Sequence, residues 1–280
     1  IDMLTKIINQ EHPNIKAYEG VEDVSKFSSS SFEEYIKVKL EECGKHIKFI
    51  KKNIIDDQYK GCVLEIGSGN GKLLFRLEEE GMLQQGIGYE LAGSRTQFAK
   101  KLGKHLNSTK VSNINGNFLS ISPQGDKYDL VIGVDIVIPL ISPLSETAEN
   151  DWLRVIKSLL KKNGWLILEL QDFENTLKMI QLSGGELRIW KEFHASDPWQ
   201  YGLDTYSIHG KDIVWDKTFI KRDLPLEKSS FTNILRPYAR DEIRDLLESA
   251  GFDKVQIFDY WSEPGDTERE EYIVIARQGN

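Results

Sequence analysis

The chain has 280 residues, of which 40% are hydrophobic and 29% are charged, and its formal net charge is −8. These values are typical of a globular protein and exclude intrinsic disorder, and the acidic balance disfavours nucleic acid as a partner because phosphate-binding surfaces are usually basic. No apolar run approaches the roughly 20 residues of a membrane span, and the N-terminus lacks a secretory pattern, so we expect a cytoplasmic protein without membrane attachment. In that reducing compartment Cys43 and Cys62 are expected to be free thiols.

The N-terminal part of the chain is polar as far as Ser31 and then becomes amphipathic over residues 32–55. Apolar residues recur there at helical spacing among lysines and glutamates, which predicts one or two helices. Ser31 is the expected N-cap, because Glu34 follows three residues later as in a capping box. We therefore expect residues 1–56 to form a helical N-terminal cap.

Short apolar runs then alternate with helical patterns. Strands are predicted at 62–66, 85–89, 110–115, 128–134 and 165–170, and helices at 72–79, 94–106 and 146–162. Strictly alternating strands and helices predict a doubly wound α/β fold with a mostly parallel sheet covered on both faces. We assign residues 57–170 to this core.

The alternation stops between residues 171 and 235, where aromatic and charged residues are frequent. Partial alternation over residues 212–220 favours an antiparallel hairpin within this insertion. A helix at 239–250 and strands at 254–260 and 272–276 then restore the pattern, so residues 236–280 are expected to complete a seven-stranded sheet.

A glycine-rich loop with Gly67, Gly69 and Gly71 follows the first strand of the core and precedes a helix. Glycine at such a position lets the backbone turn sharply and lets a nucleotide-type ligand lie against the main chain. A dinucleotide fingerprint would need a third glycine where Lys72 stands, and a phosphate-binding P-loop would need Ser or Thr where Leu73 stands. The spacing therefore disfavours a nicotinamide-dependent oxidoreductase and a nucleotide triphosphatase.

The remaining pattern, an acid two residues before the first of three alternate glycines, resembles motif I of class I S-adenosylmethionine-dependent methyltransferases. The resemblance continues through Glu90 at the end of the second strand, Asn117-Phe118 after the third, and Asp135 after the fourth. It extends to the helix and turn at 243–255, and it covers residues 61–170 and 236–277. The family fold is a seven-stranded sheet with an antiparallel last strand, here carrying an inserted acceptor-binding lid.

The resemblance implies S-adenosylmethionine as the methyl donor and S-adenosylhomocysteine as the product. In the family, the acid matched by Glu65 faces the methionine end of the donor, and the acid matched by Glu90 holds the ribose. Asn117 and Phe118 match the adenine contacts, although an amide stands where the family commonly has an acid. Simpler structural roles remain open: an ion pair for Glu65, a turn for Asn117 and a cap for Asp135. The full set of expected cofactor-binding residues is Glu65, Gly67, Ser68, Gly69, Gly71, Glu90, Asn117, Phe118 and Asp135.

The acceptor is less clearly indicated. Asp135 is followed by Ile-Val-Ile-Pro and not by the signature of nucleic-acid amine methylation, and the arrangement resembles bacterial small-molecule methyltransferases. We expect O-methylation of a sugar, glycan substituent or natural product; N-methylation and an inactive cofactor-binding subunit are the alternatives. Four cations in or beside the insertion either meet an anionic acceptor or form a solvated face: Lys217, Lys221, Arg222 and Arg236. No metal-ligand spacing is present, and both a monomer and a homodimer remain open. The candidate general bases, none singled out by spacing, are His194, Asp197, His209 and Glu192.

Overall fold

The computed structural model describes residues 12–54, 59–121, 127–193, 199–221, 228–262 and 269–279. Its main element is a seven-stranded sheet with the order β10-β11-β5-β4-β1-β2-β3. The strands are β1 (Gly61–Ile66), β2 (Leu83–Glu90), β3 (Val111–Asn115), β4 (Tyr128–Gly133), β5 (Leu160–Gln171), β10 (Phe252–Asp259) and β11 (Glu271–Gln278).

The pairing of the strands confirms the predicted fold class. Strand β1 is parallel to both β2 and β4, β2 is parallel to β3, and β4 is parallel to β5. Strand β11, the last in the chain, is antiparallel to β5 and to β10. The sheet is therefore mostly parallel, and the carboxyl ends of β1, β2 and β4 meet at one edge, where ligands bind in folds of this kind.

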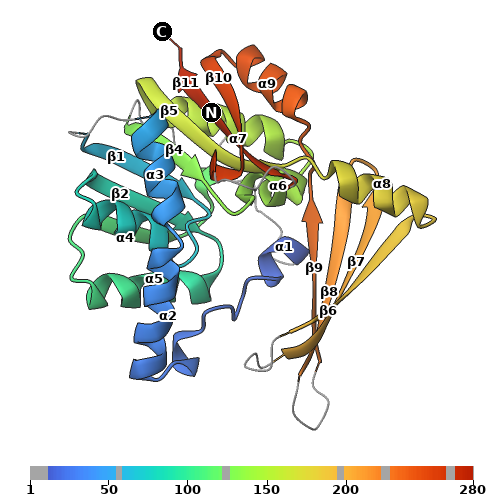
Figure 1. Cartoon of the computed structure of the whole chain (residues 1–280). Coiled ribbons are helices and arrows are strands. Elements are labelled where there is room, and N and C mark those ends of the chain that lie inside the picture. Colours follow the sequence, from blue (N-terminus) through green and yellow to red (C-terminus); the bar gives the residue numbers. More distant parts are fainter. Residues whose placement is uncertain are drawn as a thin grey trace.

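Helices cover both faces of this sheet (Figure 1). One face packs against α7 (Ala148–Leu159) and α9 (Arg240–Ser249), and the other packs against α3 (Gly44–Asn53) and α4 (Lys72–Glu79). In α7 the side chains of Trp152, Ile156 and Leu159 are fully buried, and their spacing of three and four residues is that of one helical face. Helix α5 (Gly93–His105) packs with α2 (Ser29–Glu41) through Phe98 and Phe32.

The start of α2 corrects the predicted cap. Ser28, and not Ser31, is the N-cap, and the Ser28 hydroxyl accepts a hydrogen bond from the Ser31 amide at 3.2 Å. The earlier start adds a helical turn ahead of Phe32, whose side chain is buried together with that of Ile36, four residues further on. Four consecutive serines offer several capping hydroxyls, so residue type alone could not select the one used.

A second, four-stranded antiparallel sheet has the order β6-β7-β8-β9 and extends away from the core (Figure 1). The predicted antiparallel hairpin is present, but residues 212–220 form only its second strand, which pairs with neighbours on both sides. The turn lies earlier, at Gly210, whose φ of 63° is positive. The bounds are α8 (Glu174–Leu182), which precedes the sheet, β6 (Glu186–Glu192), β7 (Trp199–His209), β8 (Asp212–Lys221) and β9 (Lys228–Leu235).

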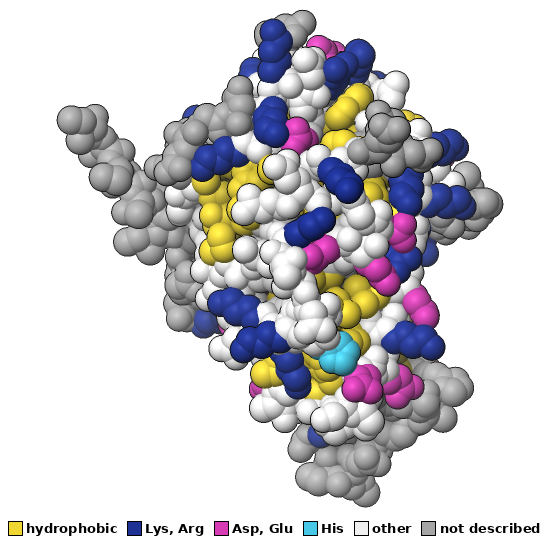
Figure 2. Space-filling view, turned by 90° about the vertical axis from the view of Figure 1, so that its left-hand side faces the viewer, with side chains coloured by type: hydrophobic (Ala, Val, Ile, Leu, Met, Phe, Trp, Pro, Cys, Tyr) yellow, Lys and Arg dark blue, Asp and Glu magenta, His cyan; other side chains and the backbone are white. Residues whose placement is uncertain are grey.

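The described surface carries both signs of charge, and both cysteines are unpaired. Figure 2 shows a face on which Lys and Arg side chains are interspersed with Asp, Glu and apolar side chains. None of the described helices has the length and apolar character needed to cross a membrane. Both Cys43, which is buried, and Cys62, which is partly buried, are free thiols.

Candidate active site

The glycine loop joins β1 to α4 and adopts a backbone that only glycine tolerates well. The φ angles of Gly67, Gly69 and Gly71 are 62°, 53° and 76°. A Cβ on Gly67 would lie 2.2 Å from Cγ2 of Val137, so the loop passes in direct contact with the segment that follows β4. Other side chains would strain the backbone and collide with this neighbour.

The carboxylate of Glu90 connects this loop to the start of α5. Its Oε2 accepts a hydrogen bond from the Gly69 amide at 2.9 Å, and its Oε1 accepts one from the Ala92 amide at 2.8 Å. Glu90 is only 8% exposed. A carboxylate oxygen has two lone pairs, so each oxygen keeps the capacity to accept a further hydrogen bond from a hydroxyl pair such as that of ribose.

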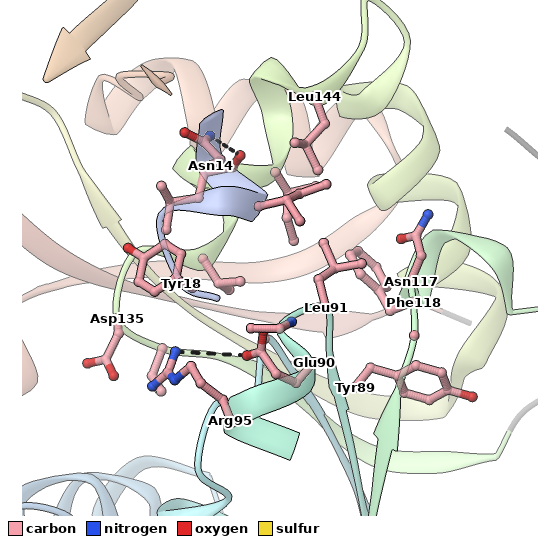
Figure 3. Close-up of a pocket in the computed structure, with 18 residues that line it drawn as sticks. Asn14, Tyr18, Tyr89, Glu90, Leu91, Arg95, Asn117, Phe118, Asp135 and Leu144 are labelled. Atoms are coloured by element: carbon pink, nitrogen blue, oxygen red, sulfur yellow. Dashed lines mark hydrogen bonds and ion pairs between the residues drawn. The ribbon is translucent and has the colours of Figure 1, made fainter. Parts of the chain in front are cut away.

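A cavity of about 180 Å³ lies at the carboxyl ends of β1, β2 and β4. Five of the predicted cofactor residues line it: Gly67, Glu90, Asn117, Phe118 and Asp135. In Figure 3, Asn117 and Phe118 lie on one side, Tyr18 and Asp135 lie on the other, and Glu90 lies between them. The apolar part of the wall, suited to a flat purine ring, consists of Ile15, Leu91, Val134, Val137, Leu140, Ile141 and Leu144.

The other four predicted cofactor residues are Glu65, Ser68, Gly69 and Gly71, and they are not among the residues that line the cavity. Glu65 is 2% exposed, and its Oε2 has no hydrogen-bond partner in the described part of the chain. Burial, followed by the charge of Asp135, raises the pKa of Glu65 well above its usual value. The Glu65 carboxyl thus lies buried in β1, two residues before the glycine loop, with one oxygen that accepts no hydrogen bond from the described residues.

Asp135 and Ile136 follow β4 in a strained conformation, with φ angles of 55° and 53°. A β-branched residue such as Ile136 is a genuine outlier there, and strain of this kind, of order 1–3 kcal/mol, is often found at functional sites. The Asp135 amide donates to Glu169 Oε2 at 3.3 Å, and Trp261 Nε1 donates to the same oxygen at 3.0 Å. The carboxylate of Asp135 is 64% exposed and lies 3.8 Å from the Lys72 ammonium.

The carboxyl group that braces this turn is itself perturbed. Burial, with the charge of Asp135 as the next cause, raises the pKa of Glu169 to about 7. Its protonation state therefore changes near neutral pH, directly below the strained turn. The indole of Trp261 also contacts the ring of His46 edge-on, with centroids 4.3 Å apart.

Arg95, which the sequence analysis missed, lies against the glycine loop. Its guanidinium donates to Glu22 Oε2 at 3.1 Å and lies 3.9 Å from Glu90 Oε2. A Cβ placed on Gly69 would be only 2.4 Å from Arg95 Nη2. Glu22 also accepts hydrogen bonds from Tyr35 Oη and Asn70 Nδ2, both at 2.7 Å. One carboxylate therefore joins the N-terminal segment to α2, to the glycine loop and to α5.

The N-terminal segment, comprising residues 12–27, covers the cavity. The sequence analysis expected a cap here but assigned none of its residues to the site. Asn14 Nδ2 donates to the carbonyls of Leu140 and Ile234, both at 2.7 Å, and Asn14 Oδ1 accepts from the Ile234 amide at 2.6 Å. Asn14 and Tyr18 both line the cavity. Burial raises the pKa of Tyr18 above its usual value, so this side chain stays a neutral phenol. The segment bridges the core and the second sheet.

A second cavity, of about 320 Å³, lies between the core, the N-terminal segment and the second sheet. It shares Tyr18, Arg95 and Asp135 with the first cavity. The two spaces therefore meet at these three residues. The remaining lining residues are Ala17, Val21, Glu22, Tyr35, Lys39, Asn70, Lys72, Lys217 and Phe231.

The candidate general bases are not brought together at this junction in the described residues. His194 and Asp197 lie outside them, and Glu192 is exposed at the end of β6. His209 is exposed at the last position of β7 and is absent from the lining of both cavities. Within the described ranges, no group of three His, Cys, Asp or Glu side chains has a geometry that could hold a metal ion.

Comparison with protein families gives a match to the methyltransferase domain over residues 58–233. Among curated proteins, carboxy-S-adenosyl-L-methionine synthase from Nautilia profundicola is 22% identical over 213 residues, which are 76% of this chain and 77% of that protein. Cyclosporin synthetase from Tolypocladium inflatum is 43% identical over 53 residues. That match covers 19% of this chain but, to the nearest per cent, 0% of the synthetase. This chain therefore spans a negligible part of that relative's length.

Solved structures share the fold at low sequence identity. A S-adenosylmethionine-dependent methyltransferase from Clostridium acetobutylicum has a TM-score of 0.64 and 12% identity, covering 95% of this chain and 97% of that one. The CcbJ methyltransferase from Streptomyces caelestis has a TM-score of 0.66 and 16% identity, with coverages of 84% and 89%. An amino pentose methyltransferase from Micromonospora echinaspora has a TM-score of 0.61 and 12% identity, with coverages of 90% and 97%.

Proposed function

This chain belongs to the methyltransferase-domain family as an S-adenosylmethionine-dependent enzyme, and we propose that it methylates an oxygen atom of a small polar metabolite. The predicted family, enzyme class and methyl donor are thereby confirmed. The acceptor and the residues assigned to each step are proposals, which rest on the geometry of the two cavities.

The observation that carries the proposal is the meeting of the two cavities at Tyr18, Arg95 and Asp135. The first cavity fits the methyl donor, because it combines a glycine loop that admits no Cβ, the Glu90 carboxylate and an apolar wall. Glu90 would hold the ribose, and Leu91 with Phe118 would enclose the adenine. When bound, S-adenosylmethionine supplies a methyl group already activated by a positive sulfur.

The residues at the junction would orient the acceptor. Methyl transfer requires in-line geometry, so the main contribution of the protein is positioning and exclusion of water. The Asp135 carboxylate and the Tyr18 ring offer a negative charge and an aromatic face, both of which favour a cationic centre nearby. Asn14 and Glu22 fasten the N-terminal segment over this region through their hydrogen bonds.

The second cavity supports a small, polar acceptor. Hydroxyl, carboxylate and ammonium groups of Tyr35, Glu22, Lys39 and Lys217 contribute to its wall, together with the ring of Phe231. Such a lining matches a hydroxylated metabolite, which needs both hydrogen-bonding groups and an apolar surface for its ring face.

The test is transfer of labelled methyl from S-adenosylmethionine to a panel of sugars, amino sugars, sugar acids, sugar phosphates and hydroxylated ring compounds. We expect a methyl ether in the product, identified by NMR, and no product with Glu90→Ala. A methylated nitrogen would contradict the O-methylation proposal. Binding of the methyl donor without product from any acceptor class would instead favour an inactive cofactor-binding subunit.

A further inference from the structure

Lys217 occupies an unusual position in the middle of β8, on the wall of the second cavity. Its ammonium nitrogen lies 3.5 Å from the ring centroid of Trp215 and 5.1 Å from that of Phe231. It donates one hydrogen bond, to Asn233 Oδ1 at 2.9 Å. A lysine ammonium has three N–H donors, so within the described part of the chain two of them have no hydrogen-bond acceptor.

The other cations of this cavity are already paired with carboxylates. Lys39 and Lys72 both contact Glu42, at 2.8 and 3.1 Å, and Arg95 contacts Glu22 at 3.1 Å. Lys217, by contrast, has no carboxylate within 4.0 Å among the residues that the structure describes. Its cross-strand neighbour Asp204 is paired with Lys191 instead.

Two buried donors beside Lys217 also lack partners. Asn233 is fully buried, and its Nδ2 has no hydrogen-bond partner within the described ranges; the same holds for Nε1 of Trp215. Trp215 and Asn233 face each other across β8 and β9, and Phe231 faces Lys217 at the next pair on the same side of the sheet. Unsatisfied buried donors are rare in proteins, and here two of them adjoin a cation that has no anionic partner.

This inference rests on the proposed function. We propose that Lys217, held in place by its hydrogen bond to the buried Asn233, forms an anion subsite, so that the methyl acceptor carries a carboxylate or a phosphate. This group binds the Lys217 ammonium at the wall formed by β8 and β9. The carboxylates of Glu22 and Asp135, which line other parts of the cavity, repel the anion from that end. The acceptor is thereby oriented with its anionic group toward β8 and its reacting hydroxyl toward the junction with the first cavity.

The charge state of Lys217 distinguishes this role from that of a general base. Burial lowers the pKa of Lys217 to about 8, with Asp204 opposing and Lys191 reinforcing the change. A bound anion stabilises the ammonium form and raises this pKa, whereas a base must be neutral when the acceptor is bound. Other charged residues also line the cavity, namely Lys39, Lys72, Glu22 and Asp135. The pKa of Lys217 is therefore compared in the same protein with and without the anion.

The experiment uses the whole chain, with and without S-adenosylhomocysteine, and inorganic phosphate and acetate as probes. NMR of ¹³C-methylated lysines gives the pKa of Lys217, whose signal is assigned by its absence in Lys217→Met. We expect the pKa to rise by about one unit on anion binding. We also expect the anion to bind at least about tenfold more weakly to Lys217→Met and to Asn233→Asp, while Lys217→Arg retains binding. Lys211→Met, which alters an exposed lysine in the turn before β8, should match the parent.

A stronger response to phosphate identifies a phosphorylated acceptor, and a stronger response to acetate identifies a sugar acid or another carboxylate. An unchanged Lys217 pKa in the presence of both anions overturns the proposal, as does equal anion binding by Lys217→Met and the parent. The pKa is measured on the parent, and in that measurement Lys217→Met or Lys217→Arg serves only to assign the signal, so a folding defect confined to one variant does not alter the measured value. Failure of S-adenosylhomocysteine to bind would contradict the proposed function, while the titration of the free protein would still decide the anion subsite.

Discussion

Asn14 gives the sharpest test of how the N-terminal segment is held over the cofactor cavity. It is 6% exposed and makes three hydrogen bonds to the backbone, to Leu140 O, Ile234 O and Ile234 N, at 2.7, 2.7 and 2.6 Å. Asn14→Ala removes all three partners at once. At a net contribution of about 1 kcal/mol for each bond, the free energy of unfolding should fall by about 3 kcal/mol.

The assay is urea unfolding, followed by calorimetry with S-adenosylmethionine. Because Asn14 and Tyr18 both line the cofactor cavity, a loosened segment should also weaken binding of the methyl donor. Asn175→Ala, at an exposed position of α8, is the matched control. It should change the free energy of unfolding by less than about 0.5 kcal/mol. Equal stability of Asn14→Ala and Asn175→Ala would refute the bracing role.

Two further predictions concern the glycine loop and the turn below it. Gly69→Ala should bind S-adenosylmethionine at least about tenfold more weakly than Gly81→Ala. Both glycines have positive φ, but only at Gly69 would a Cβ meet another side chain, Arg95 Nη2 at 2.4 Å, so equal affinities would contradict the close packing of the loop. Glu169→Gln should remove a pH dependence of stability. The pKa of Glu169 is higher in the folded chain, at about 7, than its ordinary value of 4.5, so its contribution is complete below pH 4.5 and is lost as the pH rises through 7. Between pH 5 and 8 the parent should lose about 2–3 kcal/mol of unfolding free energy relative to Glu169→Gln, measured by urea unfolding. If the free energies of unfolding of the parent and of Glu169→Gln changed in parallel with pH, the pKa of Glu169 would not be raised in the folded chain.

The core was predictable because its signals are local. Helix α4 spans Lys72–Glu79 as predicted, since Gly71 marks its start and Leu73, Leu74 and Leu77 mark its buried face. The continuous apolar run in β4 identified a strand buried on both faces. Boundaries were less accurate: helix α7 ends at Leu159, and β5 already begins at Leu160, because the apolar residues there suit either structure.

The missed parts of the site depend on contacts between distant residues. Glu22 and Arg95, which form a hydrogen bond, are 73 residues apart in the sequence, and Asn14 and Ile234 are 220 apart. A periodic sequence pattern does not predict such pairs. The second sheet was only partly visible, because polar residues such as Lys217 and Asn233 occupy its inward side and interrupt the alternation. The histidines were chosen by residue type, and residue type does not give position: His209 lies exposed beside a turn.

The central claim is that the cavity beside Glu90 holds the methyl donor, and calorimetry with S-adenosylmethionine tests it directly. The parent should bind with a dissociation constant of about 1–100 µM. Glu90→Ala should bind at least about 30-fold more weakly, because the ribose contact and the anchor of the Gly69 amide are lost together. Glu248→Ala, an exposed change in α9, should bind like the parent. If folded Glu90→Ala binds S-adenosylmethionine as tightly as the parent and Glu248→Ala do, the assignment of the cofactor site is contradicted.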